Sequence, residues 1–505
     1  MPIGEKVLYQ DTAQPVLPAQ PVSPARFDGA PARRADKPAP PPPLQQTVTP
    51  MGEAPPVPPS QGPPPVPGSK LPLGMLLKIG IGVGVFFLLL FLVVALILPR
   101  FSKPPASQHV TLTYWGLWED SAIMQPLIDG FERSHPNISI TYLKQDPNQY
   151  LDRVTTRIKN GTGPDIFRFH NSWMPVLSGS LLPFSKDTLT TAQFGKDFYP
   201  VMQTDLVRNG AIYGVPLELD TLSLFVNTDI LKSAGVTAPK TWTDFVSDAK
   251  AMTVKNQDGT IKTAGAAMGT FDNVEHAPDI LSMLFAQQGV EMSRFAASRQ
   301  DVTDALTFYT SFAKGQDNVW DQNLDNSLSA FAKGNLAMYF GYSWDILALK
   351  AMSPDLQFAI YPVPSLYGRG MSVASYWVEG VSATTRHPKE ALAFMKYLTQ
   401  KDTEQTFYSA TVNSGRLVGE PYARQDLAPL LKDNPLAFVF VDQGKDAISS
   451  YFIAKTSDGD HGINSIVNTY LGNAVRSILG DTSPESAATT LIDGVSKTLA
   501  SYGQQ

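Results

Sequence analysis

Residues 79–98 form an uncharged apolar run, IGIGVGVFFLLLFLVVALIL. A helix of this length rises about 30 Å, which matches the hydrocarbon thickness of a bilayer. Two basic residues precede the run and two follow it, so the flanking charges do not set an orientation. The run predicts one transmembrane helix, to which we assign residues 73–98.

A cleaved signal peptide is the alternative interpretation of this run. The apolar part of a signal peptide spans about 7–15 residues, lies close to the N-terminus and precedes small residues at the cleavage site. Here the run begins far into the chain and ends in Leu98-Pro99-Arg100. The pattern favours an uncleaved signal-anchor, and later cleavage of the anchor stays open.

Residues 1–70 contain 20 of the chain's 42 prolines and only two aromatic residues, Tyr9 and Phe27. Such a segment buries too little apolar surface to offset its conformational entropy. We therefore expect a disordered proline-rich tail with polyproline II character. A spacer and a docking segment for aromatic-lined grooves both remain open. Residues 99–108 are expected to form a linker.

The composition excludes several classes of protein. With 505 residues the chain exceeds what one hydrophobic core supports, which is about 250–300 residues. It lacks cysteine, which excludes disulfides, thiolate metal sites, cysteine nucleophiles and attachment through an acylated cysteine. The net charge of −6, without clustered basic residues, argues against nucleic acid as a partner.

Apolar strands and amphipathic helices alternate after His109. Val110–Tyr114 and Ile138–Tyr142 are short apolar runs, and Ile123–Arg133 between them places its apolar residues at helical spacing. The same theme returns at Leu222–Asn227 with Trp242–Met252, and at Ala337–Phe340 with Trp344–Met352. This alternation predicts βαβ units and a mostly parallel sheet.

Six motifs, in order and spread over residues 109–500, resemble the bacterial extracellular solute-binding protein family 1. This is the maltose-binding-like group, which supplies the sugar-binding component of ABC transporters. The motifs are Leu112–Glu119, Phe131–Ile138, Tyr150–Phe167, Ile212–Pro216 with Leu222–Leu231 and Pro239–Phe245, Phe331–Trp344, and Pro388–Leu398.

The resemblance implies an α/β periplasmic-binding-protein fold of the class II type, with two lobes joined by crossover strands. The ligand then lies between the lobes, near the carboxyl ends of the strands. Residues 109–505 would form the solute-binding domain, with lobe 1 at about 109–217 and 365–414, and lobe 2 at about 222–362 and 417–505. The crossovers are expected at Pro216–Leu222, at Tyr361–Ser365 and after Asn413–Arg416.

The resemblance also implies the function. The domain is expected to lie outside the cell membrane, with the tail in the cytoplasm, and to capture a sugar or oligosaccharide by hinge closure. Its partners would be the solute and the permease subunits of an ABC importer, and the chain is expected to be a monomer. Most family members carry a cleaved signal or a lipid anchor instead. A tethered sensor that signals through the helix is therefore the alternative.

Sugar capture needs flat aromatic faces against C–H groups and planar polar groups that bind hydroxyls. Trp344 occupies the family's stacking position, and Asp220 aligns with its hinge acid, which can bind a sugar hydroxyl. Asp165 is expected to be structural. The full set of expected ligand-binding residues lies at strand ends and crossovers: Trp115, Trp118, Glu119, His170, Asn171, Trp173, Glu218, Asp220, Tyr342, Trp344, Tyr376, Trp377, Glu379 and Arg416.

Enzymatic activity is not expected. The sequence has no serine-nucleophile elbow, zinc-binding histidine motif or phosphate-binding loop. The acid pair Glu218 and Asp220 leaves glycoside hydrolysis open, since that reaction uses two carboxylates about 5–10 Å apart. We expect neither a cofactor nor a metal site.

Overall fold

The structure is a computed structural model that describes residues 82, 84–93 and 109–503. The chain divides into two units, Met1–Leu96 and Ile97–Gln505. The predicted tail at 1–70 and the predicted linker at 99–108 lie outside the described residues.

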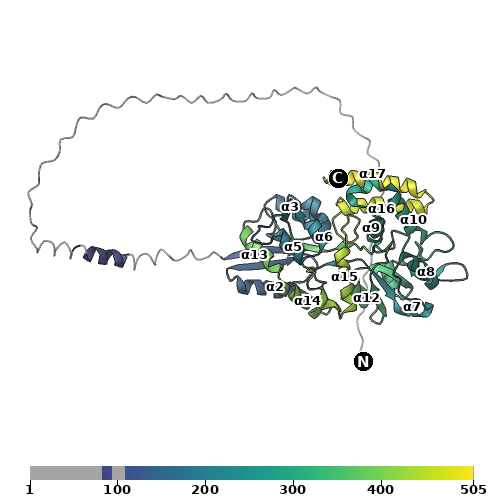
Figure 1. The fold of residues 1–505 in the computed structure, drawn as a ribbon, viewed down its shortest axis with the longest axis horizontal. Helices are drawn as coiled ribbons and strands as arrows, with labels where there is room; N and C mark the ends of the chain where they lie inside the picture. The colour runs from purple at the N-terminus through teal and green to yellow at the C-terminus, as the bar shows by residue number, and fades with distance from the viewer. Residues whose placement is uncertain (1–81, 83, 94–108, 504–505) are drawn as a thin grey trace, which may run out of the picture. The chain divides into compact units, whose positions relative to one another are not determined.

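Residues 84–93, inside the predicted span 73–98, are helical and appear in purple in Figure 1. Their large apolar side chains are exposed, as at Phe87 and Phe91. Apart from residue 82, the rest of the predicted span lies outside the described residues. No helix in the described part of the chain is both long enough and apolar enough to cross a membrane.

The second unit contains two five-stranded sheets, and the first has the strand order β2-β1-β3-β14-β6. β1 pairs in parallel with β2 and β3, whereas β14 is antiparallel to β3 and β6. Figure 1 shows helices α2, α3, α5, α6, α13 and α14 around this sheet. The elements are β1 (Val110–Gly116), α2 (Ser121–Ser134), β2 (Ile138–Lys144), α3 (Tyr150–Lys159), β3 (Ile166–His170), α5 (Thr191–Asp197), α6 (Pro200–Leu206), β6 (Val215–Pro216), β14 (Trp377–Val381), α13 (Pro388–Leu398) and α14 (Lys401–Asn413).

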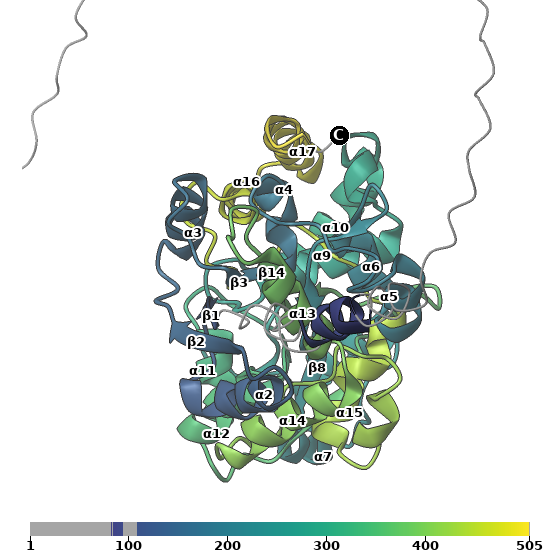
Figure 2. The same ribbon diagram turned by 90° about the vertical axis from the view of Figure 1, so that its left-hand side faces the viewer.

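The second sheet has the order β12-β8-β11-β10-β9. Helix α17 lies beside α16 in both ribbon views (Figure 1, Figure 2), and α10 contacts both of these helices. The elements are β8 (Ser223–Asn227), α7 (Thr228–Ala234), α8 (Trp242–Met252), β9 (Val254–Lys255), β10 (Ile261–Ala266), α9 (Ala277–Gln288), α10 (Arg299–Ser311), α11 (Ser327–Ala332), β11 (Leu336–Gly341), α12 (Asp345–Met352), β12 (Phe358–Tyr361), α15 (Pro435–Asp442), α16 (Ile463–Leu479) and α17 (Pro484–Ser501).

The expectation of mostly parallel sheets is wrong for this second sheet. Only β10 and β11 pair in parallel, while β8 is antiparallel to both β11 and β12. β8 directly follows β7, the strand that comes from the first lobe, and it runs antiparallel to both of its neighbours. A local pattern of strands and helices does not encode this strand direction.

Local sequence explains where the elements near the lobe junction begin and end. β3, β8 and β11 are buried along their whole length, as expected of strands covered on both faces. Asn227 then ends β8 and caps α7, because its side chain accepts the N–H groups of Asp229 and Ile230. Gly235 ends α7 in the left-handed conformation, with φ of 68°.

Two short antiparallel strands join the lobes: β7 (Asp220–Thr221) pairs with β13 (Ala374–Ser375). The prediction of a crossover at Tyr361–Ser365 is wrong, because Tyr361 ends β12 and Ser365 bridges to Thr241 within the second lobe. Prolines at this place extend the chain, but the passage between lobes comes about ten residues later, at β13.

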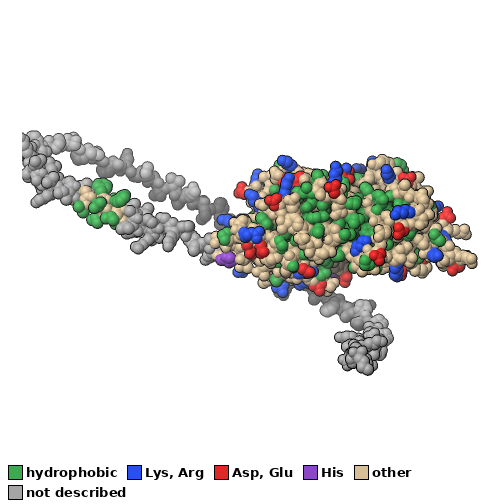
Figure 3. Space-filling view, turned by 90° about the horizontal axis from the view of Figure 1, so that it is seen from below, with side chains coloured by type: hydrophobic (Ala, Val, Ile, Leu, Met, Phe, Trp, Pro, Cys, Tyr) green, Lys and Arg blue, Asp and Glu red, His purple; other side chains and the backbone are tan. Residues whose placement is uncertain are grey.

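A third segment lies at the same junction. Tyr422, which follows α14, bridges to Glu218 next to β7, and α15 then contacts both β7 and β12. Ile448 accepts the N–H group of Ala374 in β13. On the face of the unit seen in Figure 3, acidic and basic side chains are interspersed.

Candidate functional site

The strand that crosses between the lobes carries two acids, and each binds an opposite lobe. Glu218 Oε1 accepts the backbone N–H of Trp377 in the first lobe at 2.9 Å. Asp220 Oδ2 accepts the backbone N–H and the hydroxyl of Ser343 in the second lobe, at 2.8 and 2.5 Å. One crossover therefore fixes Trp377 on one side and the loop that carries Trp344 on the other.

The first lobe presents a group of tryptophans beside this crossover. The ring of Trp377 lies 5.3 Å from that of Trp118 and 5.4 Å from that of Trp173, both in edge-to-face contact. Trp173 is fully buried, whereas Trp118 is 38% exposed and Trp377 is partly exposed. Within this group, Trp118 and Trp377 are therefore the tryptophans whose side chains reach the surface.

A buried charge network lies behind these tryptophans. The Arg168 guanidinium in β3 forms ion pairs with Glu119 and, at 2.6 Å, with Glu379 in β14. All three side chains are at most 3% exposed. Burial raises the pKa of Glu379, and the charge of Arg168 opposes this shift. Both glutamates were predicted as ligand-binding residues. In the structure, Glu119 and Glu379 instead form ion pairs with a buried arginine.

Arg168 is the main residue of the first lobe that the sequence reasoning missed. It is the only charged residue before the terminal histidine of an otherwise apolar strand, Ile166–His170. A cation in such a strand requires buried acidic partners. That signal would have linked it to the acids Glu119 and Glu379.

Two more predicted residues, Asn171 and Tyr376, meet at another missed acid, Asp205 in α6. Asn171 Nδ2 donates to Asp205 Oδ2 at 3.0 Å, and the Tyr376 hydroxyl donates to the same oxygen at 2.5 Å. His170 contacts two hydroxyls, those of Ser172 at 2.7 Å and Ser375 at 3.0 Å. Burial lowers the pKa of His170 to about 3, so its ring is neutral at pH 7.

The second lobe presents a smaller aromatic surface. Trp344 stacks on Tyr342, with ring centres 4.3 Å apart and an interplanar angle of 16°. Trp344 is 38% exposed, while Tyr342 is buried and its hydroxyl donates to Asp279 at 2.8 Å. The buried ring of Tyr342 therefore supports Trp344 from below, and the Trp344 ring is the part of this pair that is exposed to solvent.

Two predicted residues have other surroundings. Trp115, in β1, lies under the guanidinium of Arg157 at 5.8 Å and is partly buried against the core. Arg416 forms an ion pair with Glu420. The Glu420 carboxylate is one of the charges that raise the pKa of Glu218, after burial and against the opposing charge of Arg168.

Among the residues that sequence reasoning missed in the second lobe are His276, Asp279 and Asp345. His276 and Asp279 stand at the start of α9, far from Tyr342 in sequence, and only the packing of the lobe brings them together. Asp345 directly follows Trp344, so its proximity could have been inferred, but its buried contacts could not.

The molecule thus has two α/β lobes joined by a crossover strand. This strand holds the backbone of Trp377 in one lobe and the loop that carries Trp344 in the other. Such an architecture is that of a solute-binding protein. A family model described as bacterial extracellular solute-binding protein matches residues 115–405. The chain belongs to this family.

Known relatives are distant in sequence. The multiple sugar-binding protein of Streptococcus mutans is 24% identical over 390 residues, which cover 72% of this chain and 90% of the relative. The mannitol-binding protein of Pseudomonas aeruginosa is 22% identical over 348 residues, covering 63% of this chain and 78% of the relative.

Solved structures share the fold. The sugar-binding protein MalE from Xanthomonas citri matches with a TM-score of 0.63 and 20% identity, covering 77% of this chain and 98% of that protein. A cyclo/maltodextrin-binding protein complexed with maltotetraose matches with a TM-score of 0.62 and 17% identity, covering 79% and 98%. The predicted two-lobed, maltose-binding-like fold is confirmed.

Proposed function

We propose that this protein captures a sugar or oligosaccharide between its lobes. The observation that carries the proposal is the attachment of Trp377 and of the Trp344 loop to a single crossover strand. A movement of one lobe about β7 and β13 would change the separation of the two indole surfaces. Such a hinge closes aromatic faces over the apolar faces of a sugar ring and removes them from water.

Relatives support a carbohydrate as the solute. The names of two of them refer to sugars and to mannitol, and one structural relative was solved with maltotetraose. The exposed tryptophans of this chain suit the same chemistry, with Trp118 and Trp377 on one lobe and Trp344 on the other. We assign these three residues to direct ligand contact and the buried members of the predicted set to support.

The acids at the crossover favour binding over hydrolysis. Asp220 accepts two hydrogen bonds from Ser343 and one from the N–H group of Thr221. Glu218 is engaged by the Trp377 backbone, and burial raises its pKa well above the ordinary value. A carboxylate that fixes the backbone at a hinge is suited to positioning, so we assign no catalytic step to this pair.

We further propose delivery of the solute to the permease of an ABC-type importer from a membrane-anchored position. The anchor would be residues 73–98, the tail 1–70 would lie in the cytoplasm, and residues 109–505 would lie outside as a monomer. The exposed apolar side chains of the helical residues 84–93 support the anchor.

Isothermal titration calorimetry of the full chain in detergent tests the solute class. Maltose, maltotetraose, mannitol and mannobiose would be titrated beside a polyamine and an amino acid. We expect micromolar or tighter binding of at least one carbohydrate. Binding of a non-sugar alone would reject the carbohydrate assignment.

A tethered sensor is the second candidate, and the proline-rich composition of residues 1–70 favours it. Affinity capture with residues 1–70 and, separately, with the full chain would separate the two roles. A cytoplasmic signalling protein retained by the tail supports the sensor. A permease retained by the full chain and lost with the tail alone supports transport.

A further inference from the structure

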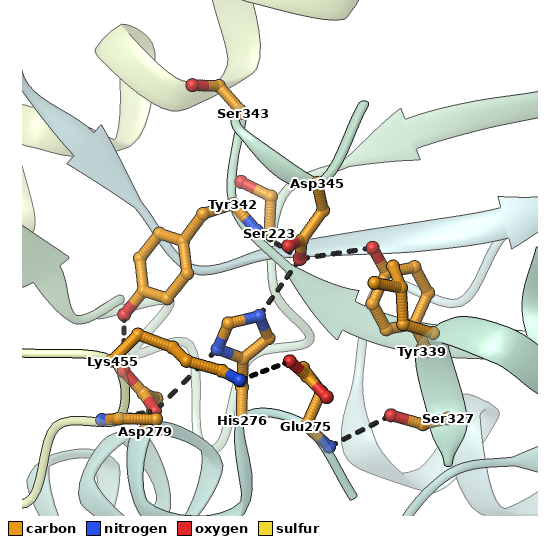
Figure 4. Close-up of polar contacts among 12 residues, drawn as sticks. Ser223, Glu275, His276, Asp279, Ser327, Tyr339, Tyr342, Ser343, Asp345 and Lys455 are labelled. Carbon is orange, nitrogen blue, oxygen red and sulfur yellow. Dashed lines mark hydrogen bonds and ion pairs between the residues drawn. The ribbon is translucent and has the colours of Figure 1, made fainter. Parts of the chain in front are cut away.

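Figure 4 shows His276 between the carboxylates of Asp279 and Asp345 and beside the ring of Tyr342. His276, just before α9, is 1% exposed. Its Nε2 lies 2.9 Å from Asp345 Oδ2, and its Nδ1 lies 3.9 Å from Asp279 Oδ2. Nδ1 has no hydrogen-bond partner within the usual distance. Its interaction with Asp279 is therefore electrostatic and not a hydrogen bond.

Both carboxylates also hold Tyr342. Asp279 Oδ1 accepts the Tyr342 hydroxyl at 2.8 Å, and Asp345 Oδ2 accepts the Tyr342 backbone N–H at 3.2 Å. The imidazole lies edge-on to the Tyr342 ring at 5.1 Å and to the Trp344 ring at 6.3 Å. The histidine, the two acids and the stacked ring pair therefore form one connected unit.

The charges of this unit require a cation. Two carboxylates buried side by side are costly unless a positive charge lies between them. Glu275, also nearby, is paired with Lys455 at 2.7 Å, which leaves His276 as the group that faces both Asp279 and Asp345. Tyr339 and Tyr342 contribute neutral hydroxyls, and Asp220 is the further acid that acts on Tyr342.

The protonation of these groups supports the same view. Burial alone lowers the pKa of His276, but the hydrogen-bonded Asp345, followed by Asp279 and Glu275, raises it above its ordinary value. Burial raises the pKa of Asp279 to about 6, against the opposing charge of His276. Above about pH 6 the Asp279 carboxyl is ionised, and below the titration of His276 the ring is charged.

We propose that His276 is a positioning residue: in its protonated form it holds Tyr342 and Trp344 in place, and it thereby makes solute binding depend on pH. The proposal rests on the proposed function for its effect on binding, but the positioning itself concerns the ligand-free protein. At higher pH the neutral ring leaves two facing carboxylates uncompensated. At lower pH protonated Asp279 no longer attracts the ring.

The positioning is tested without any ligand, by fluorine NMR of the full chain labelled with 5-fluorotryptophan. The chain has seven tryptophans, and loss of one signal in Trp344→Phe identifies Trp344. We expect this signal to shift between pH 5 and pH 10 in the wild type and to stay fixed in His276→Gln. His109→Gln, which changes an exposed histidine far along the chain, is the matched control and should titrate like the wild type.

A Trp344 signal that ignores pH, or that titrates unchanged in His276→Gln, would overturn the proposal. If His276→Gln fails to fold, the carbon-bound ring proton of His276 in the wild type decides instead, because it must titrate together with Trp344. A signal that moves with any other histidine contradicts the assignment.

Binding provides the second measurement. For a carbohydrate that binds in calorimetry, the affinity should fall by roughly fivefold or more on either side of its pH optimum, and His276→Gln should flatten this profile. A wild-type profile that persists in the variant rejects the effect on binding. If no carbohydrate binds, the proposed function fails, while the fluorine titration still decides the role of His276.

Discussion

Each lobe has a buried histidine near its surface tryptophans, and the pKa values of these two histidines are shifted in opposite directions. His170 in the first lobe and His276 in the second are both 1% exposed. His170 has two hydroxyl groups and the backbone N–H of Ser172 as partners and no carboxylate among them, so burial lowers its pKa to about 3. His276 lies between carboxylates, which raise its pKa. Burial alone does not set the charge of a histidine; its partners do.

The comparison extends to how each lobe neutralises buried acid. The first lobe uses Arg168, which stays charged at all accessible pH values. The second uses His276, whose charge is lost as pH rises through its raised pKa. We therefore expect the charge of Arg168 behind Trp118 and Trp377 to persist at all accessible pH values, and the charge of His276 behind Trp344 to be lost as pH rises.

The largest effect is expected from Arg168→Met. The change leaves Glu119 and Glu379 buried without their partner, which costs about 3–5 kcal/mol of unfolding free energy. Urea denaturation followed by circular dichroism measures it. Arg476→Met, which removes the exposed pair with Asp272, is the control and should cost less than about 1 kcal/mol. Equal losses in both variants would contradict the buried network.

The next largest effect is a loss of unfolding free energy at acidic pH, which we expect from the protonation of His170. Its pKa is depressed in the fold, so its contribution to stability is present above its unfolded value and is lost as pH falls toward about 3. Between pH 7 and pH 4.5 this loss is about 2–3 kcal/mol. It should be missing from His170→Gln in urea denaturation at the two pH values.

For His276→Gln we expect the opposite dependence of unfolding free energy on pH, which sharpens the comparison of the two lobes. The raised pKa of His276 means that its contribution is present at low pH and is lost as pH rises through the folded value. The difference in unfolding free energy between wild type and His276→Gln should therefore shrink from pH 7 to pH 9.5. Parallel behaviour of the two histidine variants would break the comparison of the lobes.

A smaller effect is expected on carbohydrate affinity. Trp344 is the single exposed indole assigned to the second lobe, whereas Trp118 has Trp377 beside it. Trp344→Ala should weaken binding by about 2 kcal/mol and Trp118→Ala by about 1 kcal/mol, both measured by calorimetry. Tyr367→Ala, at a 90% exposed ring, should leave affinity unchanged. A larger loss in Trp118→Ala would reverse the ranking.

The smallest effect is expected from Lys455→Ala, which removes the ion pair with Glu275. The Lys455 side chain is 58% exposed, so the pair should contribute about 0.2–1 kcal/mol to unfolding free energy. Thermal unfolding at low and high salt would measure it. A loss that salt does not reduce would assign Lys455 to the buried charge unit instead of the surface.

Much of the fold was predictable because its periodicities are local. The runs at Val110–Tyr114 and Ala337–Phe340 lie in β1 and β11, and Trp242–Met252 is α8 to the residue. Strand direction in the second sheet and the crossover at β13 were not predictable, because both depend on how the chain enters a lobe.

The sequence indicated which tryptophans lie near the lobe junction, but not which side chains are buried behind them. Trp118, Trp344 and Trp377 stand at strand ends, where the chain order alone brings aromatic residues to the lobe junction. Glu119 and Glu379 looked similar in sequence but face Arg168. An acid in a sequence does not show whether its partner will be a solute or a guanidinium elsewhere in the fold.

The sequence by itself determined that a chain without cysteine carries an apolar run, then an α/β body with aromatic residues at its strand ends. These are properties of residue type and short-range spacing. Only the tertiary structure decided that the crossover containing β7 contacts both lobes. It also decided that Arg168 forms ion pairs with Glu119 and Glu379, and that His276 lies between Asp279 and Asp345. Most of these contacts join residues far apart in the sequence, and the charges of the groups depend on burial and on partners that come together only after folding.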